Sequence, residues 1–95
     1  MIVRFRHRGL RRLYERGDRS GLNPEHVDKI YSIPGWLDLA TQPEDMDLVG
    51  LRLHALKGEF SGFWSVVVRA NWRIIFRVEN GEVTDVDYLD YLDYH

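Results

Sequence analysis

Apolar residues in the first half of the chain recur with the spacing of an α-helix. Two groups fall at i, i+3 and i+4, namely Leu10, Leu13 and Tyr14, and Val27, Ile30 and Tyr31. The first group predicts a helix over residues 7–15. The second predicts a helix that begins after Asn23-Pro24, a favourable N-cap and first-turn pair. Pro34-Gly35 should interrupt this second helix, because proline lacks a backbone donor and clashes with the preceding turn.

From Leu51 onward the apolar residues alternate with other residues, which is the period of a β-strand. The alternation predicts strands over residues 51–56, 64–69, 73–78 and 83–91. Asn80-Gly81 predicts a type I′ hairpin turn between the last two strands. Helices followed by an antiparallel meander indicate an α+β fold, with the N-terminal helices packed on one face of a small sheet.

Two further segments are less regular. Residues 2–5 alternate weakly and suggest a short first strand, and residues 42–47, with Pro43 and three acids, suggest a polar linker. At 95 residues and 11.3 kDa, the chain is expected to form a single domain over residues 1–95. The absence of cysteine and of any apolar run of about 20 residues favours a cytoplasmic protein without a membrane span.

The net charge is −2, yet the first twenty residues carry seven arginines against only Glu15 and Asp18. A local basic patch attracts phosphate within about a Debye length of ~8–10 Å, although such patches are often merely solvated helix surfaces. The four histidines, at positions 7, 26, 54 and 95, lack the spacing of a metal site, and no glycine-rich phosphate loop is present. We therefore expect neither a metal nor another cofactor.

The alternation also sorts the charged side chains by face. His54 should share a face with Arg52, and Arg69, Arg73 and Arg77 should share one across the hairpin if Ala70-Asn71 forms the turn. The helices must cover the apolar face, so the arginine face should stay open. A register shift of one residue would reverse this arrangement.

Several segments are similar to the HigB toxins of the RelE/ParE superfamily. They are Gly9–Tyr14, Pro43–Leu48, Leu53-His54-Ala55-Leu56-Lys57-Gly58, Phe63-Trp64-Ser65-Val66, Val68–Ile74 and Asp93-Tyr94-His95. The resemblance covers nearly the whole chain. It implies a compact α+β toxin that cleaves mRNA on the ribosome, and a helix-turn-helix antitoxin of the HigA type. Operator DNA would be contacted only through that antitoxin.

Metal-free cleavage of RNA by its own 2′-OH needs a base, an acid and cations for the phosphate. Histidine titrates near neutral pH, while arginine and lysine bind phosphate. With the resemblance, these residue types suggest catalytic roles for His54, Lys57, Arg73, Asp93, Tyr94 and His95. His54 and His95 would transfer protons, in an order left open. Arg73 and Lys57 would hold the phosphate, Asp93 and Tyr94 would orient or stack, and Arg69 and Arg77 would bind RNA.

The C-terminus repeats a Leu-Asp-Tyr unit, which leaves two registers for the terminal motif. Counting from Arg73 places it at Asp90-Tyr91-Leu92, whereas counting from the chain end places it at Asp93-Tyr94-His95. Three residues of strand advance about 10 Å and invert the face. We take the terminal triplet because only it contains histidine.

Two other functions remain open. A ParE-like toxin would poison a topoisomerase without catalysis, and a degenerate module would keep only the antitoxin surface. The presence of His54, Lys57 and His95 speaks against the topoisomerase poison, whereas the repeated Leu-Asp-Tyr unit keeps the degenerate module open.

Overall fold

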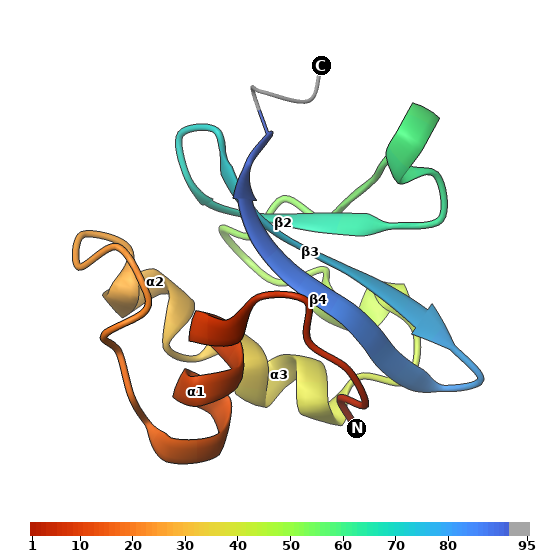
Figure 1. Ribbon diagram of the computed structural model, residues 1–95. Helices are drawn as coiled ribbons and strands as arrows, with labels where there is room; N and C mark the ends of the chain where they lie inside the picture. The colour runs from red at the N-terminus through yellow and green to blue at the C-terminus, as the bar shows by residue number, and fades with distance from the viewer. Residues whose placement is uncertain (92–95) are drawn as a thin grey trace.

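The computed structural model describes residues 1–91 and has the predicted α+β architecture (Figure 1). Its α-helices are α1 (Arg8–Arg16), α2 (Val27–Ile30) and α3 (Ile33–Leu39). Its strands are β1 (His54–Ala55), β2 (Trp64–Arg69), β3 (Trp72–Glu79) and β4 (Glu82–Asp90). The short 3₁₀ helices η1 (Pro43–Met46) and η2 (Gly58–Phe60) precede and follow β1.

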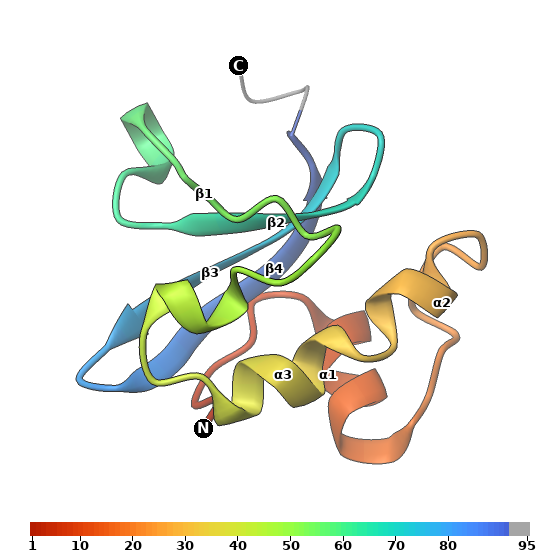
Figure 2. The ribbon, with the colours of Figure 1, turned by 180° about the vertical axis from the view of Figure 1, so that it is seen from behind.

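The strands form an antiparallel sheet in the order β1-β2-β3-β4, and the helices gather on one side of it (Figure 1). Seen from behind, β1 lies next to β2 at the edge farthest from β4 (Figure 2). The core between the layers includes Leu10, Leu13, Ile30, Ile33 and Leu37 from the helices and Val66, Ile74, Phe76 and Val86 from the strands. Burial of these side chains, at roughly 25 cal/mol per Å² of apolar surface, holds the helices on that face. The other face is left for a site.

Tight turns at the two predicted positions fix the register of the sheet. Ala70-Asn71 joins β2 to β3, and Asn80-Gly81 joins β3 to β4. Asn80 and Gly81 have φ angles of 53° and 78°, as a type I′ turn requires, and these residues adopt positive φ more readily than others. The hairpin prediction is confirmed.

The first segment does not form the continuous strand expected over residues 2–5. Ile2 and Phe5 make isolated parallel bridges to Val83 and Val86 of β4. The predicted first helix is confirmed as α1, with His7 as its N-cap. The chain therefore runs along the edge of the sheet before turning into α1.

The interruption of the second helix is confirmed, although its position differs from the expected one. The break separates α2 from α3 before Pro34, which occupies the first turn of α3, where no backbone donor is needed. Asn23 accepts a hydrogen bond from the Glu25 backbone at 2.9 Å and starts a turn, so α2 itself begins only at Val27.

Two predictions about the middle of the chain are wrong. Residues 42–47 are not a simple linker, because η1 forms there and buries Met46 completely. Residues 51–56 do not form one strand: only His54–Ala55 pairs as β1, and Arg52 has a left-handed φ of 51° that interrupts extended backbone.

Candidate active site

The register of the sheet places His54 and Arg73 on the same face, opposite the helices. His54 lies opposite Ser65, which in turn lies opposite Ile75. Arg73 lies opposite Val67, two residues further along β2 than Ser65. Paired residues, and every second residue of a strand, point to the same face. Strand spacings then separate the His54 and Arg73 Cα atoms by roughly 12 Å.

Both side chains line a cavity of about 590 Å³, which we call the sheet cavity. Its lining residues are Arg52, Leu53, His54, Leu56, Ser65, Val67, Ala70, Arg73 and Tyr91. Among residues 1–91, no carboxylate lines it. Two guanidinium groups and an imidazole around a partly apolar floor favour an anionic ligand over a cation.

The Arg73 guanidinium is held from one side. Its Nη1 donates hydrogen bonds to the carbonyl oxygens of Ala70 at 2.6 Å and Trp72 at 3.3 Å. Within residues 1–91, Arg73 makes no ion pair with a carboxylate. The group is thus held by neutral carbonyl partners, and its planar fork suits a phosphate.

Arg52 also lines the sheet cavity, and it was not among the predicted site residues. The alternation had placed Arg52 on the same face as His54, and this pattern could have marked it as a site residue. Its left-handed backbone could not be inferred from that alternation. Ser65, buried opposite His54, was missed as well, because nothing in its sequence context distinguishes it from a structural strand residue.

Of the two C-terminal registers, only Asp90-Tyr91 falls within the described residues. Tyr91 lines the sheet cavity, and its backbone donates a hydrogen bond to the Asn71 carbonyl at 3.0 Å. Asp90 lies opposite Trp72 of β3. Trp72 packs against the buried core and does not line the cavity. Asp93, Tyr94 and His95 lie outside the described residues. Of the alternative pair, Tyr91 is therefore the member beside His54 and Arg73.

Lys57 is exposed and immediately precedes η2. It follows Leu56, which lines the sheet cavity, but Lys57 itself does not belong to the lining. The structure thus brings together His54, Arg73 and Tyr91, and it places Lys57 at the end of β1.

The prediction that Arg69 shares a face with Arg73 is wrong. A β-bulge between Val67 and Arg69 shifts the register, so that Arg69 lies opposite Trp72. Its Nη1 instead lies 3.7 Å from Oε2 of Glu25, in the turn before α2. Simple alternation fails here because one extra residue in a strand changes the face of those that follow.

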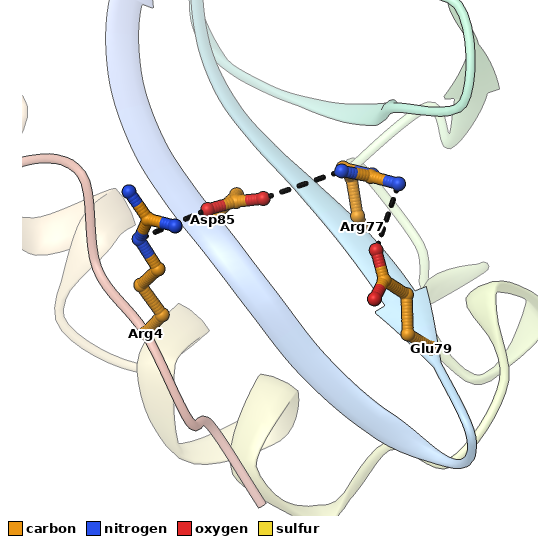
Figure 3. A network of polar contacts seen from close by, with 4 residues as sticks. All are labelled: Arg4, Arg77, Glu79 and Asp85. Carbon is orange, nitrogen blue, oxygen red and sulfur yellow. Dashed lines mark hydrogen bonds and ion pairs between the residues drawn. The ribbon is translucent and has the colours of Figure 1, made fainter.

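Arg77 belongs to a network of opposite charges rather than to the sheet cavity (Figure 3). Its guanidinium nitrogens lie 2.7 Å from Glu79 and 3.4 Å from Asp85. Asp85 also pairs with Arg4, at 3.3 Å, and the Arg77 guanidinium lies 5.6 Å from the Phe63 ring centroid. Two acids thus offset much of the charge that Arg77 would offer to RNA.

His7 and His26 have structural positions. His7 Nδ1 accepts a hydrogen bond from the Leu10 backbone at 3.2 Å, and burial lowers the pKa of His7. His26 is buried, with Nδ1 hydrogen-bonded to the Tyr88 hydroxyl and its ring beside Trp72. Neither ring lines the sheet cavity.

Comparison with known proteins identifies the family of the chain. Residues 3–95 match the family described as RelE-like toxin of type II toxin-antitoxin system HigB. A Proteus vulgaris protein named Endoribonuclease HigB is 43% identical over 95 residues, with both chains covered completely. The chain belongs to the HigB-like toxin family. The resemblance inferred from the sequence is thereby confirmed, and a toxin of this family works with an antitoxin.

The family assignment spans the sheet cavity and the terminal residues alike, since the match runs to residue 95. Within residues 1–91, no group of three or more metal-ligating side chains is present. None of the helices in that part of the chain is long and apolar enough to cross a membrane.

Proposed function

We propose that this chain is the toxin of a type II toxin-antitoxin pair and cleaves mRNA on the ribosome without a metal ion. The observation that carries the proposal is the sheet cavity, where His54 and Arg73 meet with no carboxylate among the described lining residues. The relative named Endoribonuclease HigB supports the reaction class.

In the proposed reaction, the 2′-oxygen of a ribose attacks the adjacent phosphorus as its proton passes to a base. The bond from phosphorus to the 5′-oxygen breaks, and that oxygen receives a proton from an acid. The products are a 2′,3′-cyclic phosphate and a 5′-hydroxyl, so no water or metal ion is consumed. Proton transfer by positioned side chains typically contributes 10²–10⁴-fold to such a rate.

We assign the roles as follows. His54 transfers one of the two protons, and its position in the sheet cavity supports this. Arg73 binds the phosphate and stabilises the charge that grows in the transition state, an effect commonly worth several kcal/mol. His95 supplies the second proton transfer, and Lys57 adds positive charge. Tyr94 and Asp93, or Tyr91 in the other register, orient the nucleotide.

The partners follow from the same proposal. The family implies an antitoxin, and we propose one of the helix-turn-helix HigA type, through which alone operator DNA is contacted. The substrate is mRNA held by the ribosome, so the protein would act in the cytoplasm.

The test is to induce the chain in bacterial cells and map the 5′ ends of a translated and an untranslatable reporter transcript. We expect cuts within codons of the translated transcript only. Arg73→Ala and His54→Ala should each lower the cut frequency by about 10²-fold or more, since each removes a phosphate or proton-transfer group. Arg16→Ala, which removes an exposed charge from α1, is the matched control.

Growth arrest without new 5′ ends would contradict the proposal and favour a topoisomerase poison. Neither arrest nor cuts would favour a module that only binds its antitoxin. Cuts that persist in Arg73→Ala would remove Arg73 from the reaction.

A further inference from the structure

We infer that Arg52 is a second phosphate-binding residue of the sheet cavity and contributes to RNA binding more than to the chemical step. The inference rests on the proposed function. Arg52, on the wall of the cavity opposite Arg73, would contact the ribose-phosphate backbone of the bound RNA.

The geometry places the two arginines on either side of Val67. The Val67 backbone donates a hydrogen bond to the Leu51 carbonyl at 2.7 Å, which brings the segment before β1 alongside β2 at this point. Val67 lies opposite Arg73 on its other side. Two strand spacings separate the flanking chains by roughly 10 Å, and Arg52 and Arg73 both belong to the lining of the cavity between them.

The charge of Arg52 is uncompensated within the described residues. Arg4, Arg69 and Arg77 each lie within 4.0 Å of a carboxylate oxygen, whereas Arg52 makes no such pair in residues 1–91. Its side chain is exposed, and the described cavity lining contains no acid. An exposed guanidinium beside a cavity whose described lining residues include no carboxylate attracts anions from solvent.

The backbone of Arg52 gives a second, independent indication. Its φ of 51° lies in the left-handed region, which asparagine and glycine adopt at lower cost than arginine. Gly50, two residues earlier, has a φ of 84° and so supplies the ordinary residue type for such a position. Unfavourable backbone conformations of this kind cluster at ligand-binding sites, and Arg52 lines the sheet cavity.

The experiment measures binding of a fluorescein-labelled, fully 2′-O-methylated RNA dodecamer, which cannot be cleaved, between 50 and 300 mM NaCl. Arg52→Asn should weaken binding about tenfold at 50 mM, because one charge-assisted phosphate contact is lost. It should also reduce the slope of log K against log salt by about 0.7, the value for one phosphate contact on a single strand. Arg52→Lys should retain most of the affinity and the full slope.

Two controls separate binding from folding. Arg16→Asn removes the same charge from α1 and should leave both affinity and slope unchanged. Arg52→Asn should have a Tm equal to or above that of the unmodified chain, since asparagine tolerates positive φ. In ribosome-programmed cleavage, the same variant should raise KM while kcat stays within about threefold.

An unchanged affinity and slope in Arg52→Asn would overturn the inference. So would a lowered Tm of this variant that accounts for its loss of affinity. The inference would also fail if the unmodified chain did not bind the RNA at 50 mM NaCl. If the unmodified chain cleaves translated mRNA and Arg52→Asn has the same KM and the same salt slope of binding, the proposed function stands and only the role of Arg52 fails. If Arg52-dependent binding is found but no transcript is cut, the proposed function fails instead.

Discussion

His7 illustrates how a single residue links local structure to pH. Its Nδ1 accepts the Leu10 backbone hydrogen bond at the start of α1, so a proton on that nitrogen would break the cap. Burial lowers the pKa of His7, and Arg12 lowers it further, while Asp87 acts in the opposite direction. A positive charge at a helix N-terminus is also opposed by the helix dipole.

We predict that the free energy of unfolding falls as pH decreases below about 6.5, where the unfolded chain protonates His7 before the folded chain does. The stabilisation is fully present above the unfolded pKa. His7→Asn replaces the ring nitrogen with an amide oxygen as the cap acceptor, and it should remove part of this dependence. Urea denaturation from pH 5 to 8 measures it, and equal slopes in both proteins would contradict the assignment.

Asp38 affects stability in a different pH range from His7. Hydrogen bonds from the Tyr14 hydroxyl and the Ile2 backbone lower the pKa of Asp38 below its usual 3.8. The stability that this group contributes is lost only as pH falls below about 4, so it does not overlap the His7 window.

At the level of elements, the sequence correctly predicted the helices and strands in which apolar residues recur with a regular period. α1, β2 and the Asn80-Gly81 hairpin are confirmed because local propensity and burial agree there. η1 was missed because its one buried apolar residue, Met46, sets no period among acids that favour solvent. The bulge before Arg69 was missed because no local residue signals an extra position in β2.

Met46 should therefore contribute more to the free energy of unfolding than the polar residues around it in the sequence suggest. Met46→Ala is expected to lower the free energy of unfolding by about 2–4 kcal/mol, since it leaves a void among core residues. Glu44→Ala, an exposed change in the same turn, should alter it by less than about 0.5 kcal/mol. Chemical denaturation checks both, and a similar small effect for the two variants would restore the linker interpretation.

For the whole molecule, the layer arrangement explains the open site. The helices occupy one face of the sheet, so the candidate site lies in a cavity on the other. The sequence motifs predicted His54 and Arg73 as site residues, and strand pairing places both on the same face of the sheet. The relation of Tyr91 to them depends on register, which local sequence does not determine because the Leu-Asp-Tyr unit is repeated.

An open cavity on a small sheet offers little to hold a flexible substrate in an attack-ready pose. Such positioning accounts for about 7–11 kcal/mol of a barrier, and we expect the ribosome to provide much of it. Purified transcript alone should therefore be cut at least about 10³-fold more slowly than the same transcript on translating ribosomes. Gel analysis of both reactions measures the ratio, and comparable rates would contradict ribosome dependence.

The edge pairing of the first residues with β4 has a practical consequence for handling the protein. The Met1 carbonyl accepts a hydrogen bond from Val83, next to the Asn80-Gly81 hairpin, whereas Tyr91 at the far end of β4 lines the sheet cavity. An affinity tag joined before Met1 would thus project from the end of the molecule away from the cavity. A tag joined after His95 would be separated by only residues 92–95 from Tyr91, which lines the sheet cavity, so comparing the two fusions distinguishes a blocked site from an inactive one.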